Sequence, residues 1–396
     1  MNDVVIVEAC RTAVGSMGGT LKPCQPEDLA CAVINGILKR SGIDPSIIDD
    51  VILGHCRQSS DNPNIARIAA LKCGIPEEVP AYTIMRQCAS GLQAVNDGVA
   101  AIKSGDADVI LAGGTESMTN AIFYLRNARY GLGTGNTVLV DSLTEGQFRS
   151  QPQDIYGIFN MGMTAENVAE RYGISREAQD EFALESQLRA AAAIKAGKFE
   201  EEIVPVMVPQ KKGDPIEFKV DEYPRETSME KLSKLKPAFK EGGTVTAGNS
   251  SGRNDGASAL LLMSDKKANE LGLKPLAVIR SFAAAGVDPR IMGIGPVPAT
   301  KKVLKKAGLT LSDIELIELN EAFAAQSLAC INELGLDKSI VNVNGGAIAL
   351  GHPVGSSGSR ILITLLYEMR RRKLKYGLAT LCVAGGMGVA DIIEIV

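Results

Sequence analysis

Short runs of β-branched and other apolar residues alternate along the chain with segments whose apolar residues recur at helical spacing. In the first third of the sequence this alternation predicts strands at 4–9, 49–54, 80–85 and 107–114, and helices at 27–40, 64–74 and 90–105. A β-α-β series buries its strands only in a sheet covered by helices, so the expected class is a layered α/β fold.

The alternation stops near residue 118 and returns after residue 255. Residues 118–160 are rich in loop-forming residues, and a long helix is expected at 175–197, with Ser175 as N-cap and Gly197 as its stop. After 255 the pattern predicts strands at 257–264, 275–286, 314–319, 339–346 and twice within 377–396, and helices at 298–308, 321–335 and 356–372. "ADVILAGG" and "GLATLCVAGG" are similar, which favours two similar halves whose matching loops meet at a shared site.

Composition excludes several classes of function. A chain of 396 residues with a formal net charge of −4 has no basic stripe for a nucleic acid. No apolar run approaches the ~18 residues of a membrane helix, and the N-terminus does not read as a signal peptide, so a cytoplasmic protein is expected. Eight cysteines without a C-x-x-C pair indicate neither a metal site nor a redox motif. They are expected to be free thiols, one of which could be a nucleophile.

Cys88 is the first candidate nucleophile, in the stretch "QCASGLQAV". It follows an expected strand and precedes an expected helix, where free N–H groups and the helix dipole favour a thiolate. Gly91 permits another backbone to approach closely. A lone cysteine is more often a packing residue, so the flanking pattern is what favours catalysis.

His352 lies in the glycine-rich stretch "GGAIALGHPVGSSGSR" and is one of only two histidines in the chain. A thiol nucleophile needs a base, and histidine is its usual partner. Gly351 and Gly355 remove bulk near the imidazole, as a histidine beside a substrate requires. The other histidine, His55, has poor metal-ligand spacing and is expected to be structural or, at most, to line a pocket.

Two further polar residues stand where expected strands end. Asn320, in "ELNEAFAAQ", could hold a water, stabilise an oxyanion, or cap the following helix. Cys382, in "LCVAGGMG", could act as an acid or base if its pKa, normally ~8.5, is tuned. Taken alone, Cys382 would be a core cysteine.

These stretches, in this order and over essentially the whole chain, resemble the thiolase family. The matching segments are "CASGL", "NEAF", "GGAIALGHPVGSSG" and "CVAGGMG", with "RTAVGSMGGTLK", "MGMTAENVAERYGISREAQDEFALESQ" and "VTAGNSSGRNDGA" as further landmarks. The resemblance implies a five-layer α-β-α-β-α fold of two similar halves. Residues 1–117, with 251–273 returning to them, would form the N-terminal half and 274–396 the C-terminal half, while 118–250 would be an inserted loop domain that binds coenzyme A.

The resemblance also implies an acyltransferase that catalyses reversible condensation of an acyl-CoA with acetyl-CoA, and thiolytic cleavage of a 3-ketoacyl-CoA. By position, Cys88 would be acylated. His352 would take its proton and, with a water held by Asn320, stabilise the thioester oxyanion. Cys382 would be the acid and base at the substrate α-carbon.

Coenzyme A is expected as a co-substrate rather than as a permanent cofactor. The positions that match the family's coenzyme A contacts are Ser251, Arg225, Phe239 and Met161. The family resemblance further implies a homodimer or homotetramer, a role in fatty acid metabolism, and neither a nucleic-acid nor a membrane partner.

Two positions depart from the family pattern. Asn160 stands where acetoacetyl-specific thiolases commonly have a histidine, so the substrate could be acetoacetyl-CoA or a longer 3-ketoacyl-CoA. Ala384 stands where the family often has glycine; its N–H, an expected oxyanion donor, remains, but a positive φ there would cost about 1 kcal/mol.

Two other functions would share parts of this pattern. A decarboxylating ketoacyl synthase of the same superfamily would need two histidines, or a histidine and an asparagine, after the nucleophile. Only one histidine lies downstream of Cys88, and Asn320 belongs to N-E-A-F, so this rival is disfavoured. The second rival is a non-catalytic acyl-CoA-binding protein on a thiolase scaffold, which would have lost a catalytic residue, and none is lost.

Overall fold

The computed structural model describes residues 3–396. Its strands are β1 (Val4–Thr12), β2 (Gly15–Ser16), β3 (Asp50–Gly54), β4 (Ala81–Ile84), β5 (Val109–Ser117), β6 (Phe123–Tyr124), β7 (Val140–Asp141), β8 (Ile203–Val204), β9 (Val206–Val208), β10 (Ile216–Phe218), β11 (Asn254–Ser264), β12 (Ala277–Gly286), β13 (Leu316–Leu319), β14 (Tyr376–Val383) and β15 (Met387–Ile395). Its helices are α1 (Pro26–Ser41), α2 (Ile65–Lys72), α3 (Ser90–Ser104), α4 (Ser142–Phe148), α5 (Gln153–Tyr156), α6 (Met161–Tyr172), α7 (Arg176–Lys195), α8 (Met229–Ser233), α9 (Asp265–Glu270), α10 (Pro296–Ala307), α11 (Ala324–Leu334), α12 (Ala347–Leu350) and α13 (Ser357–Arg372).

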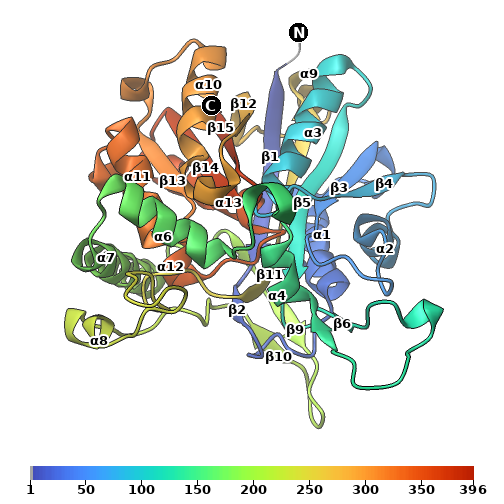
Figure 1. Ribbon diagram of the computed structural model, residues 1–396. Coiled ribbons are helices and arrows are strands. Elements are labelled where there is room, and N and C mark those ends of the chain that lie inside the picture. Colours follow the sequence, from blue (N-terminus) through green and yellow to red (C-terminus); the bar gives the residue numbers. More distant parts are fainter. Residues whose placement is uncertain (1–2) are drawn as a thin grey trace.

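Two sheets and three helical layers make up the fold, as Figure 1 shows. The first sheet has the order β1-β11-β5-β3-β4 and the second β12-β15-β14-β13; a short antiparallel pairing of β1 with β12 joins their edges. Helices α1 and α2 pack on the outer face of the first sheet, and α10 and α11 on the outer face of the second. Helices α3 and α13 fill the space between the sheets. The predicted five-layer class is confirmed.

One hydrophobic core, between the two sheets, contains side chains from both halves of the chain. It contains Val95 of α3 and Ile361 of α13, and residues of both sheets, such as Ile110 and Leu381. Because these side chains come from both halves, the starts of α3 and α13 are held side by side. The loops that precede those helices carry Cys88 and His352.

Glycines allow α3 and α13 to approach at this point. A Cβ at Gly91 would lie 2.5 Å from the Ser359 Oγ, and one at Gly358 would lie 2.7 Å from the Leu92 Cβ. Both separations are shorter than side chains tolerate, so larger residues would push the helices apart. The close approach expected at Gly91 is therefore confirmed.

The segment between β5 and β11 lies across the carboxyl ends of the central strands (Figure 1). Its long helix α7 has the predicted ends: the Ser175 side chain accepts a hydrogen bond from the Ala178 N–H at 3.1 Å, and Gly197 has φ +67°. No helix among residues 3–396 is both long enough and apolar enough to cross a membrane.

One predicted strand is wrong. Residues 339–346 form a short helical turn and a loop rather than a strand. Asn342 has φ +46°, and its amide accepts a hydrogen bond from the Leu319 N–H at 2.8 Å and donates one to the Leu319 carbonyl at 2.8 Å. A side chain thus takes the place of a neighbouring strand at the end of β13, which an apolar run alone does not reveal.

Candidate active site

Cys88 lies in a tight turn between β4 and α3. Gln87, just before it, has φ +45°, an uncommon conformation for a residue with a side chain. The Ser90 hydroxyl holds the turn: it accepts from the Arg86 N–H at 2.9 Å and donates to the Gln87 carbonyl at 2.7 Å. The turn directs Cys88 into a cavity of about 180 Å³ at the start of α3. Backbone strain held by a local hydrogen-bond network is common where a side chain has a chemical task.

The surroundings of the Cys88 thiol act on its pKa in opposite directions. Burial has the largest effect and raises the pKa of Cys88 above its usual value, while a backbone hydrogen bond from Ala384 and the positive charge of Arg57 lower it only in part. The expectation that the helix start favours a thiolate is therefore not met. The N–H at the start of the turn after β14 is therefore directed at the Cys88 sulfur. Ala384 keeps this donor, as expected, and the cost of a positive φ does not arise there, because the left-handed residues are Gly385 and Gly386, at φ +88° and +85°.

His352 faces the same cavity, and its neighbours fix its tautomer. The Nδ1 atom lies 2.6 Å from the Ser357 Oγ, and that hydroxyl donates its own hydrogen to the Pro353 carbonyl at 2.9 Å. Nδ1 must therefore carry the hydrogen and donate it to Ser357. Nε2 is left with a free lone pair, and no protein group among the described residues bonds to it.

Burial, with a smaller contribution from the charge of Arg360, lowers the pKa of His352 to about 3. The imidazole is therefore neutral near neutral pH, with the lone pair of Nε2 free. The glycine beside it is required: at Gly351, φ is +98°, and a Cβ would lie 2.5 Å from the side chain of Asn254. That same side chain accepts the His352 N–H at 2.9 Å.

Asn320 is 1% exposed, and neither atom of its side-chain amide has a hydrogen-bond partner within residues 3–396. Buried polar groups are nearly always bonded, so a free amide indicates a place for a water or a substrate atom. Asn320 is not a helix cap, because α11 begins at Ala324 and its N-cap is Phe323. The capping alternative is therefore wrong.

Cys382 is the next-to-last residue of β14 and is 1% exposed. It packs in an apolar cluster with Met292, Ala322 and Phe323, which line the cavity, although Cys382 itself is not among the lining residues. Burial and then the charge of Cys88 raise its pKa well above the usual range. The two thiols therefore lie within electrostatic reach of each other, and a thiol held protonated is suited to donate a proton.

Three of the four expected coenzyme A contacts line the cavity: Met161, Phe239 and Ser251. Phe239 packs edge-on against Phe323, with ring centroids 6.2 Å apart. Arg225 is outside this set. Its guanidinium lies over the Tyr223 ring at 5.0 Å and donates to the Ala247 carbonyl at 3.4 Å.

Two buried glutamates that sequence reasoning missed organise the loops of the site. Glu116 accepts the N–H groups of Cys56 and Arg57, at 3.1 Å each, and of Gly355, at 3.0 Å, so it ties the loop after β3 to the loop of His352. The Nδ1 atom of His55 lies 3.2 Å from a Glu116 carboxylate oxygen, and His55 is buried. This agrees with the structural role that was one of the two expected for His55.

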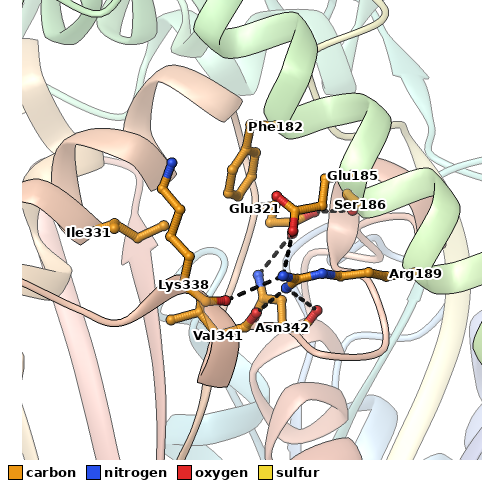
Figure 2. Close-up of a pocket in the computed structure, with 9 residues that line it drawn as sticks. All are labelled: Phe182, Glu185, Ser186, Arg189, Glu321, Ile331, Lys338, Val341 and Asn342. Carbon is orange, nitrogen blue, oxygen red and sulfur yellow. Dashed lines mark hydrogen bonds and ion pairs between the residues drawn. The ribbon is translucent and has the colours of Figure 1, made fainter. Parts of the chain in front are cut away.

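Glu321, the residue after Asn320, plays the corresponding part; Figure 2 shows it with Ser186 and Asn342. It accepts hydrogen bonds from Ser186 of α7 at 2.6 Å, from Asn342 at 2.9 Å and from the Ile348 N–H at 3.2 Å. The crevice drawn there holds only about 10 Å³, so it is a packing defect around this network rather than a second binding site. The position of Glu321 directly after Asn320 in N-E-A-F was the only feature of the sequence that could have indicated its role.

Two arginines that line the cavity, Arg57 and Arg253, were also missed. Their places directly after β3 and before β11 were the available signal. No group of three or more histidine, cysteine, aspartate or glutamate side chains in residues 3–396 is arranged to hold a metal ion.

A layered α/β fold whose two halves bring a partly buried thiol and a neutral imidazole to one cavity is typical of acyltransferases. Residues 4–266 match the family described as "Thiolase, N-terminal domain", and residues 273–395 match "Thiolase, C-terminal domain". The chain belongs to the thiolase family.

Relatives and solved structures agree along the full length. The acetyl-CoA acetyltransferase of Cupriavidus necator is 54% identical, with 100% of both chains covered. The probable acetyl-CoA acyltransferase of Staphylococcus aureus is 49% identical and covers 100% of this chain and 99% of its own. The crystal structure of the Bacillus anthracis acetyl-CoA acetyltransferase has a TM-score of 0.97 at 47% identity, covering 100% and 99% of the two chains. Human mitochondrial 3-ketoacyl-CoA thiolase in complex with CoA has a TM-score of 0.94 at 45% identity, covering 100% and 98%.

Proposed function

We propose that this thiolase cleaves 3-ketoacyl-CoA thiolytically, and runs the reverse condensation, through an acyl-enzyme at Cys88. The observation that carries the proposal is that Cys88 and His352 line one cavity and that His352 Nε2 is a free acceptor. A non-catalytic acyl-CoA-binding protein has no need of an unpartnered base beside a thiol, so nothing favours that alternative.

In the first half of the cleavage, the Cys88 sulfur attacks the 3-keto carbon and its proton passes to His352 Nε2. The C2–C3 bond breaks, and the departing enolate of acetyl-CoA takes a proton from Cys382. In the second half, the Cys382 thiolate removes the thiol proton of coenzyme A, which attacks the acyl-enzyme. Cys88 leaves and recovers its proton from His352, so every bond and proton is restored.

Negative charge develops on the substrate's 3-keto oxygen and on the enolate oxygen in the first half, and on the acyl-enzyme's thioester oxygen in the second. Two sets of groups are suited to stabilise these oxyanions. The Ala384 N–H is directed at Cys88, and the free amide of Asn320 can hold a water beside His352. Coenzyme A would reach this point along Met161, Phe239 and Ser251, which line the cavity. Met161 and Phe239 belong to the segment 118–250 that we assign to coenzyme A binding, and Ser251 follows it directly. Arg225 would contact only the end of coenzyme A that is farthest from its thiol.

Asn320→Ala is expected to lower turnover by about 10²- to 10³-fold, the range typical of losing an oxyanion donor. The measurement is steady-state cleavage of acetoacetyl-CoA per folded molecule, with folding followed by circular dichroism. Asn332→Ala, at an exposed position on α11, is the matched control and should retain full turnover. Wild-type turnover in Asn320→Ala would remove the amide from the mechanism.

The proposed cleavage is tested with coenzyme A and 3-ketoacyl-CoAs of four, six and eight carbons, with release of acetyl-CoA as the readout. We expect six-carbon substrate to be cleaved as well as acetoacetyl-CoA. The side chain of Asn160 is bound to the Met163 N–H at 2.9 Å as the cap of α6, and no histidine projects into the acyl site at this position. Activity confined to acetoacetyl-CoA would contradict the broader chain length, and no cleavage of any substrate would contradict the function.

We also propose that the chain assembles as a homodimer or homotetramer, acts in the cytoplasm and serves fatty acid metabolism. Two features support assembly. Strand β4 is a sheet edge whose outer side has no partner strand among the described residues. The arm around β6 and β7 exposes large apolar side chains, including Phe123, Tyr130 and Val138. The arm extends away from the body of the molecule in Figure 1.

A further inference from the structure

Two arginines in the cavity wall have no protein partner. Arg57 follows β3 and Arg253 precedes β11, and both line the cavity that holds Cys88. Within residues 3–396 neither guanidinium makes an ion pair with a carboxylate or a hydrogen bond, and the Nε of Arg57 is fully buried. Both side chains are half-buried, and two unpaired guanidiniums that line one cavity favour a ligand that can pair with them.

Nearby carboxylates are occupied elsewhere. Glu116 is fully buried and accepts three backbone N–H groups, including that of Arg57 itself. Asp141 caps α4 through the N–H groups of Leu143 and Thr144. No aspartate or glutamate of the described chain lines the cavity, and His352 is neutral. The lining of the cavity therefore carries two positive charges and no negative one, although the charge of Arg253 also acts on Asp141 outside it. Such a lining favours an anionic ligand.

The placement of Arg57 indicates which part of a ligand carries the negative charge. Its guanidinium packs on the backbone of α4, where a Cβ at Gly146 would lie 2.4 Å from Nη1. Its neighbour Cys56 donates to the Gln87 carbonyl at 3.0 Å, directly beside Cys88. Arg57 thus belongs to the wall around the nucleophile. The phosphates of coenzyme A are a full pantetheine arm away from the thioester and do not reach this wall while the thioester is at Cys88.

We propose that the acyl group of the preferred substrate ends in a carboxylate, which Arg57 and Arg253 bind, so that the enzyme acts on CoA monothioesters of 3-keto dicarboxylic acids. This inference rests on the proposed cleavage at Cys88. Cleavage breaks the C2–C3 bond, releases acetyl-CoA and transfers the shortened acyl group, with its carboxylate, to coenzyme A. Guanidinium–carboxylate pairs are the strongest side-chain hydrogen bonds available for recognising that end.

The test compares kcat/KM for 3-keto dicarboxyl-CoAs of six, seven and eight carbons with that for their terminal methyl esters. The ester keeps the length and removes the charge. The wild-type enzyme is expected to prefer one free acid by about tenfold to a hundredfold, the range of one or two charge-assisted bonds. This ratio should fall in Arg57→Leu and reach about one in Arg57→Leu/Arg253→Leu.

Arg149→Leu is the matched control, because Arg149 is an exposed arginine at the end of α4 that does not line the cavity. It should retain the wild-type acid-to-ester ratio. Equal losses on acid and ester in Arg57→Leu, with an alkaline shift in the pH dependence of Cys88 alkylation, would show that Arg57 acts on the thiol and would overturn the proposal. A wild-type preference for the esters would also overturn it.

Failure of the proposed function is distinguishable from failure of this inference. If acetoacetyl-CoA and the esters are cleaved without a preference for acids, only the inference falls. If nothing is cleaved, the proposed function falls. The inference is then decided by competition between glutaryl-CoA and valeryl-CoA for acylation of Cys88, read by mass spectrometry: an excess of the glutaryl adduct supports it, and an excess of the valeryl adduct overturns it.

Discussion

Cys88→Ala is expected to abolish both acylation by acyl-CoA and cleavage of 3-ketoacyl-CoA, with turnover falling by about 10⁴-fold or more. No other group that lines the cavity is a thiol, so none can replace Cys88 in forming the thioester. The measurement is the intact mass of the protein after incubation with acyl-CoA, followed by peptide mapping. The wild-type protein should carry one acyl group, on the peptide that contains Cys88.

Cys73→Ala provides the control for this experiment, because Cys73 is a half-buried thiol at the end of α2 that does not line the cavity. This variant should be acylated as the wild type is. An acyl group found on another cysteine of the wild-type protein, and none on Cys88, would contradict the assignment of the nucleophile.

Cys382→Ala is expected to separate the two chemical halves of the reaction. Acylation of Cys88 by a simple acyl-CoA requires no proton at a carbon, so the variant should still be acylated. Condensation and cleavage should fall by about 10²- to 10⁴-fold, the range typical of removing a general acid or base. The measurement is single-turnover acylation beside steady-state cleavage, both corrected for the folded fraction.

A packing role for Cys382 makes a different prediction. The residue is buried in an apolar cluster, so alanine there would lower the free energy of unfolding by about 1 kcal/mol and leave turnover per folded molecule almost intact. Cys330→Ala is the matched control, since Cys330 is also fully buried in the C-terminal half but lies outside the cavity. Near-normal cleavage in Cys382→Ala would contradict the two-cysteine mechanism.

The arginine inference and the chain-length prediction both concern the acyl group of the substrate. Asn160, where acetoacetyl-specific thiolases commonly have a histidine, is engaged as the cap of α6 and does not line the cavity. Arg57 and Arg253 add positive charge to the cavity wall. A substrate longer than acetoacetyl-CoA that ends in a carboxylate would use both features, whereas a short neutral acyl group would use neither.

The sequence by itself determined the class of fold and the candidate chemistry. Its apolar periodicity is local, so strands such as β5 and β11 and helices such as α7 could be predicted within a few residues. Cys88 and His352 stood out for a related reason: backbone demands in their own loops, such as the left-handed Gly351, require residue types that are visible in the sequence.

Only the tertiary structure decided which groups are free and which are occupied. The 339–346 segment has the composition of a strand, but an asparagine side chain from it bonds the end of β13 instead. From the sequence, Asn320 could be a helix cap or a catalytic amide. In the structure α11 begins at Ala324, so Asn320 does not cap it and its side-chain amide has no partner among the described residues. Arg57 stands two residues after His55 in the sequence, and only the packing of distant segments places it in the cavity wall. Hydrogen-bond satisfaction and net charge at a site are sums over residues far apart in the chain, so they exist only once the chain has folded.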